Sequence, residues 1–164
     1  LAAAAAASAA QGAVLYRAGS AWATLAAGSS GQVLTTGGAS ANPSWANHGQ
    51  VILPYWSGGV QATGVGTSRL YIEETSTIVG ARASLGTAPT GSSFIVDVNK
   101  NGTTIFTTQG NRPTVAASGN TSGTPTAPDV TTLAAGDYLT VDVDQIGSTV
   151  AGSDLTVTVI IRKA

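Results

Sequence analysis

The chain of 164 residues has no cysteine, no methionine, one histidine and few charged side chains. Without cysteine, a disulfide framework and a thiolate metal site are both excluded. Lys, Arg, Asp and Glu make up only 9% of the residues, whereas ordinary soluble domains carry about a quarter. The formal net charge is -1, and phosphate binding needs clustered Lys and Arg, so nucleic acid is not an expected partner.

Small uncharged residues, mainly alanine, glycine, serine and threonine, take the place of the missing charge. They suit chains that pass close together, or an extracellular surface, better than a cytosolic enzyme. The alanine run Ala2–Ala7 is too short to span a membrane and lacks the basic start of a signal peptide. Leu1–Ala10 is either the end of a helix in a bundle of chains or a flexible linker. Because Leu1 is not an initiator methionine, we expect further residues to precede it.

A short sequence motif occurs twice near the N-terminus. The segment Gly12–Trp22 is restated as Gly31–Trp45, with its apolar pair at a constant offset and a lengthening at Ala39–Pro43. Similarity at a fixed offset marks stacked repeats. A unit with two apolar residues and one tryptophan cannot bury them against itself, so it needs neighbouring repeats or other chains. The expected packing residues are Val14, Leu15, Trp22, Val33, Leu34 and Trp45.

The repeat region, residues 1–50, is predicted to form a stem of short strands. Ala13–Tyr16, Ala21–Leu25 and Gln32–Thr35 are bounded by glycine and serine turns. Hairpins of this size are not stable alone in water. The stem therefore requires assembly.

From Val51 onward, longer alternating runs predict a β-sandwich head over residues 51–164, jelly-roll-like and all-β. In Leu139–Asp144 every second residue is apolar, so Thr140, Asp142 and Asp144 are expected on a solvated face. The polar segment Thr114–Thr126 is expected to be an exposed loop. The expected strands are Val51–Trp56, Arg69–Glu73, Thr77–Leu85, Phe94–Asn99, Thr104–Thr107, Tyr138–Gln145 and Leu155–Arg162.

Two sets of residues resemble a known family. Gly31–Ala39, followed by Asn42–Ala46, resembles the repeat of fibre proteins from tailed bacteriophages. Val96–Phe106, Asn111–Pro113 and Ala135–Gly147 resemble the all-β domain that often ends such fibres. The resemblance implies a trimeric stem, with three chains around one axis, and a virion location outside the cell.

The function that this resemblance implies is that of a virion structural protein, a homotrimeric tail fibre whose head attaches to the host. Three heads would bind a bacterial surface glycan or protein multivalently, and the N-terminal side would meet other virion proteins. An alternative is a capsid-attached fibre or decoration protein without a receptor role. A surface-polysaccharide depolymerase would need a long parallel β-helix or a cleft with separated acids, and the chain indicates neither. No catalytic residue, cofactor or membrane insertion is expected.

Receptor contacts are expected on the loops of the head, because loops carry function on rigid β scaffolds. Arg112 is the expected polar anchor; its alternative role is a structural salt bridge or a carbonyl clamp at a subunit boundary. Among the large aromatics, Tyr55, Trp56 and Tyr71 are expected in the core or at a subunit interface rather than at a ligand. The expected receptor-binding residues are Asn111, Arg112, Asn120 and Thr121.

Two carboxylate patterns suggest chemistry but have simpler explanations. Asp97, Asn99 and Asn101 reproduce the first half of a calcium loop, but the twelfth position is Thr108 instead of glutamate. A hairpin turning at Asn101-Gly102 is the favoured interpretation, and no metal is expected.

The second pattern is the pair Asp142 and Asp144, which share one face of a predicted strand. A glycosidase draws its two carboxylates from separate elements that flank a cleft. We therefore expect these two to be solvated surface groups.

Overall fold

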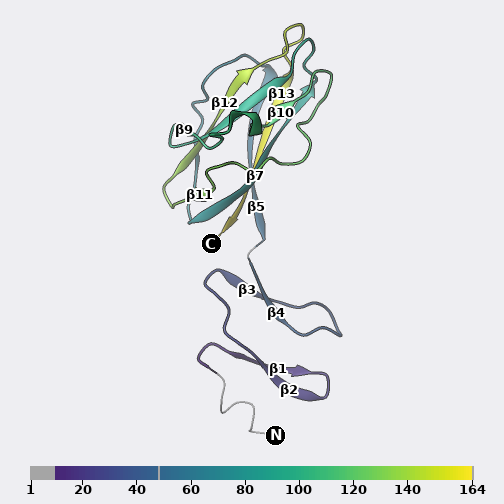
Figure 1. Ribbon diagram of the computed structural model, residues 1–164, viewed down its shortest axis with the longest axis vertical. Helices are drawn as coiled ribbons and strands as arrows, with labels where there is room; N and C mark the ends of the chain where they lie inside the picture. The colour runs from purple at the N-terminus through teal and green to yellow at the C-terminus, as the bar shows by residue number, and fades with distance from the viewer. Residues whose placement is uncertain (1–9, 48, 164) are drawn as a thin grey trace. The chain divides into compact units, whose positions relative to one another are not determined.

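The computed structural model describes residues 10–47 and 49–163 (Figure 1). The expected leader lies outside these residues, apart from Ala10. The chain divides into two compact units, one ending at Gly49 and one covering Gln50–Lys163. Among the described residues, no helix has the length and apolar character needed to cross a membrane.

The first unit consists of two antiparallel hairpins. β1 (Val14–Ala18) pairs with β2 (Ala21–Leu25), and β3 (Gln32–Thr35) pairs with β4 (Ser44–Asn47). Each pair is a separate two-stranded sheet. The predictions of β2 and β3 are confirmed to the residue, while β4 was not expected.

The second unit is a β-sandwich, and the all-β prediction is confirmed. One sheet has the strand order β11-β7-β13-β5, and the other has the order β10-β8-β12-β6, with β9 paired to β8. We call them the β5 sheet and the β12 sheet. Their strands are β5 (Gln50–Val60), β6 (Leu70–Tyr71), β7 (Ser76–Thr87), β8 (Phe94–Lys100), β9 (Thr103–Thr104), β10 (Thr114–Val115), β11 (Thr132–Leu133), β12 (Tyr138–Gln145) and β13 (Ser153–Lys163).

The strand pairings of the sandwich are nested. β5 pairs with β13, β6 with β12, β7 with β11 and β8 with β10, all antiparallel. The chain therefore runs out and back as one long folded hairpin, whose pairs fall alternately into the β5 sheet and the β12 sheet. A one-turn 3-10 helix, η2 (Gln109–Asn111), precedes β10.

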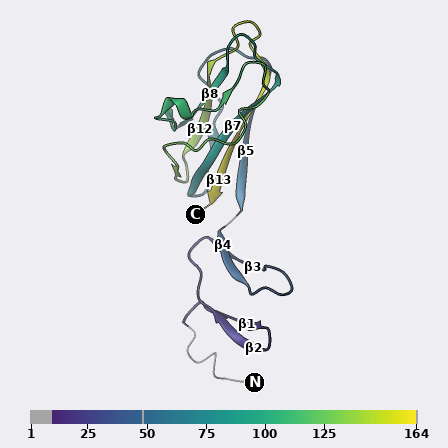
Figure 2. The ribbon, with the colours of Figure 1, turned by 45° about the vertical axis from the view of Figure 1, so that its right-hand side comes forward.

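The core lies between the two sheets, which Figure 2 shows as two layers. It follows from the alternation along the long strands, because one face of each strand points inward. Phe94 and Phe106 are its largest fully buried side chains, and Tyr55 packs against it from β5. The buried hydrophobic residues are Ile72, Ile78, Ala81, Ala83, Leu85, Phe94, Val96, Val98, Ile105, Phe106, Val115, Leu133, Leu139, Val141, Leu155, Val157, Val159 and Ile161.

Two expectations about polar segments were wrong. Thr114–Thr126 is not simply an exposed loop: it begins as β10, and Val115 is fully buried. Farther along, Thr121 and Thr126 form bridges to β7, because the backbone groups at the edge of β7 need partners. Thr140 is also buried rather than solvated.

Candidate functional site

The calcium-like segment forms a hairpin, as the favoured interpretation predicted. Lys100 pairs with Thr103, and Asn101 and Gly102 have φ angles of 51° and 82°. Positive φ at both central residues is the geometry of a type I′ turn, for which Asn-Gly is the preferred sequence. Asn101 is also fully engaged, since its side chain donates to Asp137 and accepts from the amide of Tyr138.

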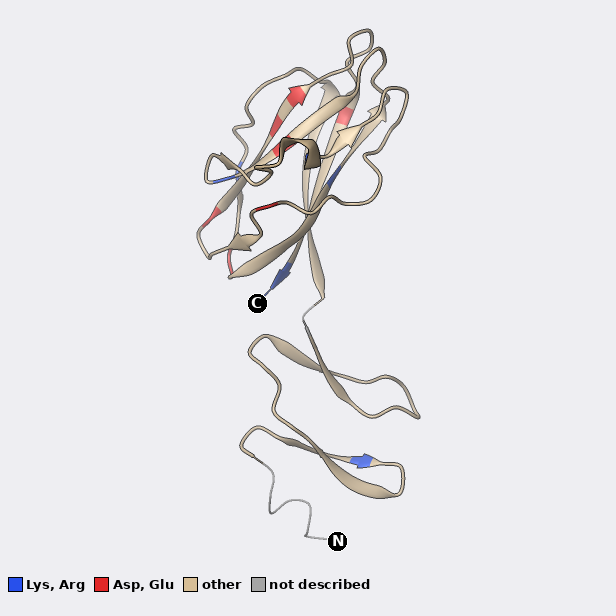
Figure 3. Cartoon of the chain, viewed as in Figure 1, with Lys and Arg blue, Asp and Glu red and all other residues tan. Residues whose placement is uncertain are grey.

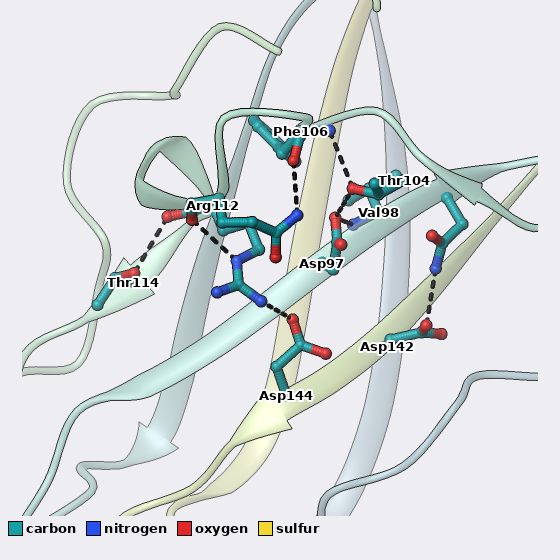
Figure 4. Close-up of polar contacts among 10 residues, drawn as sticks. Asp97, Val98, Thr104, Phe106, Arg112, Thr114, Asp142 and Asp144 are labelled. Carbon is teal, nitrogen blue, oxygen red and sulfur yellow. Dashed lines mark hydrogen bonds and ion pairs between the residues drawn. The ribbon is translucent and has the colours of Figure 1, made fainter. Parts of the chain in front are cut away.

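The other two candidate metal ligands lie in a polar cluster on the outer face of the β12 sheet (Figure 4). The cluster forms because β8 and β12 pair in a register that sets Asp97 opposite Asp142. Asn99 of β8 also connects the two strands, because its side-chain amide donates to the carboxylate of Asp142 on β12 at 2.7 Å. The members of the polar cluster are Asp97, Asn99, Thr104, Arg112, Asp142 and Asp144.

Arg112 belongs to this cluster through structural contacts. Its guanidinium forms an ion pair with Asp144, and its Nε donates to the carbonyl of Gln109 at 2.9 Å (Figure 4). These contacts tie η2 to the end of β12. Arg112 therefore makes a salt bridge and a carbonyl contact, both within one chain. Asn111, next to it, is exposed on η2.

The other pair of expected receptor residues lies along β7, in the opposite sheet. The side-chain amide of Asn120 donates to the carbonyls of Leu85 and Gly86. The hydroxyl of Thr121 accepts from the amide of Gly123. Within the described part of the chain, no hydrogen bond or ion pair joins this pair to Asn111 and Arg112, so the four residues do not form one cluster.

The carboxylates of the cluster are held by hydrogen bonds rather than aimed at a cleft. Asp142 accepts from the amide of Gly66 at 2.8 Å as well as from Asn99, while Asp144 binds Arg112. Over residues 10–47 and 49–163, no group of three or more His, Cys, Asp or Glu is arranged to hold a metal ion. The polar cluster therefore holds two segments against β12: η2 through Arg112 and Asp144, and the loop before β6 through Gly66 and Asp142.

The negative charge of Asp97 lowers the stability of the folded protein, because the carboxylate is buried. Its side chain is only 7% exposed, and burial raises its pKa above the usual value, with the nearby Asp144 adding to the rise. Hydrogen bonds from Thr104 and from the amide of Val98 act in the opposite direction. A carboxyl with a raised folded-state pKa binds more protons in the folded than in the unfolded state, so its contribution to stability falls as pH rises through that range.

We expect Asp97→Asn to be more stable than the wild type at pH 7. The asparagine oxygen can accept the same two hydrogen bonds, and the buried charge is gone. The gain should shrink to nothing as the pH falls below 3.8, the ordinary aspartate value, because Asp97 is then neutral in both states. Thermal unfolding of the two proteins between pH 3 and pH 7 measures the difference, and a gain that does not vary with pH would contradict the assignment.

A shallow hollow at the side of the β12 sheet was not expected from the sequence. The guanidinium carbon of Arg69 lies 4.4 Å from the ring centre of Tyr138. The rings of Tyr138 and the exposed Tyr71 are 5.9 Å apart and tilted by 56°. The hollow has a volume of about 240 Å³, and its lining includes Thr67 and Thr140 beside Arg69 and Tyr138. Such a surface offers an aromatic ring edge and a cation to a ligand.

The packing residues of the stem keep apolar surface uncovered. Leu15 and Leu34, equivalent in the two repeats, are each 48% exposed, and Trp22 is 43% exposed. Val14 and Val33 are half-buried. Among residues 10–47, each hairpin is a sheet of two strands without a second sheet against it.

The two tryptophans do not occupy equivalent positions. Trp22 lies opposite Arg17 in the first hairpin, whereas Trp45 lies opposite Leu34 in the second. Trp45 is half-buried, and its indole N–H donates to the carbonyl of Ala26 at 2.6 Å. Trp45 therefore fastens the second hairpin to the connection between β2 and β3, whereas Trp22 is exposed.

Comparison with protein-family models, with curated proteins and with solved structures found no match to this chain.

Proposed function

We propose that this chain is a structural fibre protein of a tailed-bacteriophage virion, a homotrimeric tail fibre whose head attaches to the host surface. The observation that carries the proposal is the stem, with Leu15, Trp22 and Leu34 exposed on two isolated hairpins. Hairpins of two strands are marginal in water. Other copies of the chain supply the missing layer, as the resemblance to phage fibre repeats implies.

The head is a jelly roll in this proposal. The nested pairing of eight strands in two antiparallel sheets supports that fold. A rigid sandwich of this kind presents its loops and hollows to a partner without reorganisation, which lowers the entropic cost of binding.

The hollow beside Arg69 and Tyr138 is the part of the head whose chemistry best fits a bacterial surface glycan. Because the Arg69 guanidinium already lies over the Tyr138 ring, a sugar would meet the apolar edge of that ring, while the guanidinium donates to its hydroxyl or carboxylate oxygens. One such open site binds weakly. Three heads on one stem convert weak sites into firm attachment through avidity.

The first test is the solution mass of the 164-residue chain by light scattering, before and after heating. A trimer that survives heating supports the fibre proposal. A monomer at every accessible concentration would sink it, because the stem would then be stable without other chains.

Attachment is tested separately on an array of bacterial surface glycans. Arg69→Ala is expected to weaken binding at least about tenfold, since a hydrogen bond to a charged group contributes about 1.5–3 kcal/mol. Lys163→Ala, which removes a cation from an exposed ion pair with Glu74, serves as the control. Equal binding by both variants would remove the hollow from the proposal.

A further inference from the structure

An apolar strip runs along β5 on the outer face of the β5 sheet, beside the polar positions Thr156 and Thr158 of β13 and Arg82 of β7. Along β5, Ile52, Pro54 and Trp56 alternate with residues that pack against the core. Ile52 is 59% and Trp56 is 71% exposed. Ile160 of β13 lies directly opposite Ile52 and extends the strip to the neighbouring strand. We call these four apolar residues the β5 strip.

The exposed side chains of the β5 strip are packed in an ordered way along the strand. A Cβ placed on Gly58 would come within 2.9 Å of the Trp56 ring, so the indole lies along the strand over a residue that leaves room for it. A tryptophan in this position gains little from its own chain. An exposed apolar patch on an ordered face marks an interaction site.

The open edge of β5 points to the same conclusion. Among the strands that the structure describes, β5 is the last of its sheet and pairs only with β13. No Lys, Arg, Asp or Glu occurs in the sequence between Arg17 and Arg69. Soluble proteins protect a long edge strand with charges or cover it. Depletion of charge is also the compositional mark of an interface centre.

We infer that the β5 strip is the contact between heads, and that a second copy of this chain covers it. The occupant follows from chain connectivity. Only His48 and Gly49 separate β4 from β5, and three peptide steps reach at most about 11 Å. Copies held together by their stems therefore start their β5 strands near one another, at a high effective concentration.

This inference rests on the proposed function, because the stem must bring the copies together. It adds a specific surface to it. The three heads then pack against one another instead of moving independently on the stem. In this trimer the β5 strip of each head faces a neighbouring head. The hollow beside Arg69 lies on the other sheet and stays free for a ligand.

The absence of cysteine allows a clean test with single thiols. Ile52→Cys places a thiol in the strip, and Val150→Cys places one on the connection between β12 and β13. Val150 is 42% exposed, less than Ile52 at 59%, so the isolated chain predicts the faster reaction at position 52. In the assembled protein we expect the thiol at position 52 to react with a maleimide at least about tenfold more slowly than the thiol at position 150.

The mass of each sample is measured in parallel, which separates the two proposals. A trimer in which position 52 reacts as fast as position 150 overturns the head contact and leaves the fibre proposal intact. A monomer overturns both.

A second readout needs no thiol. The difference in fluorescence between wild type and Trp56→Phe isolates the emission of Trp56, which is expected to be shielded from acrylamide in the trimer. Full quenching by acrylamide in a trimer would again contradict the contact.

Discussion

The double substitution Leu15→Asn with Leu34→Asn is expected to convert the assembled protein into monomers. Both leucines are 48% exposed on two-stranded hairpins, and in the proposed fibre other copies of the chain cover them. Burying a leucine contributes about 1.5–3 kcal/mol, and burying an amide without a partner costs about 1–3 kcal/mol. Two such positions in every chain therefore weaken assembly by roughly a thousandfold or more.

Light scattering over a range of concentrations measures this effect. Asparagine introduced at Ser20 and Ser40, which lie in the exposed connections of the same two hairpins, is the matched control. The control is expected to remain a trimer. If the leucine variant also stays trimeric with unchanged heat resistance, the assembly does not depend on these two leucines.

The strands of this protein could be predicted from sequence where alternation and turn residues agree. Tyr138–Gln145, Ala21–Leu25 and Gln32–Thr35 were predicted with their observed bounds. β10 and β11 were missed, because each has two residues and exists only through its pairing with β8 or β7. A pattern of local residues carries no signal for a strand that a distant neighbour creates.

The candidate sites show the same division between local and distant information. The turn at Asn101-Gly102 was predictable because its geometry depends on two adjacent residues. The polar cluster was not, since Asp97 and Asp142 meet only through the register of β8 against β12. Sequence reasoning treated them as parts of two unrelated motifs, a calcium loop and a carboxylate pair.

The aromatic residues divide in a way that sequence composition could not decide. Tyr55, Trp56 and Tyr71 were all expected in the core or at an interface. Tyr55 packs against the core, while Trp56 and Tyr71 are exposed. Adjacent residues on a strand point to opposite faces, so one of Tyr55 and Trp56 had to face outward. The strand pattern alone does not say which face the core covers.

Gly147→Ala is expected to destabilise the head by about 3 kcal/mol or more, at the upper end of the cost of overpacking. Gly147 is buried in the connection between β12 and β13. A Cβ there would lie 1.9 Å from the carbonyl oxygen of Val150, and 2.8 and 2.9 Å from the amide nitrogen and carbonyl oxygen of Thr90. All three are backbone atoms, so no side chain can rotate away to make room.

The surrounding hydrogen bonds prevent the two segments from moving apart cheaply. The amide of Thr90 donates to Val150 at 2.9 Å, and the amide of Thr149 donates back to Thr90 at 3.0 Å. The added methyl group must therefore break the joint between the β7–β8 connection and the β12–β13 connection. Buried backbone groups left without partners add their own cost.

Gly110→Ala is the matched control, because a Cβ at Gly110 meets nothing within 4 Å and the change is expected to stay within about 0.5 kcal/mol. Urea denaturation of both variants and the wild type, at one protein concentration, gives the comparison. If the two variants unfold at the same urea concentration, the two connections are not packed against each other as described. Composition cannot distinguish Gly147 from Gly110 among the 21 glycines, because the requirement for glycine arises from the fold. The turn after Gly147 places the carbonyl oxygen of Val150 against it, and the packing of the two connections adds Thr90 from a segment more than 50 residues away.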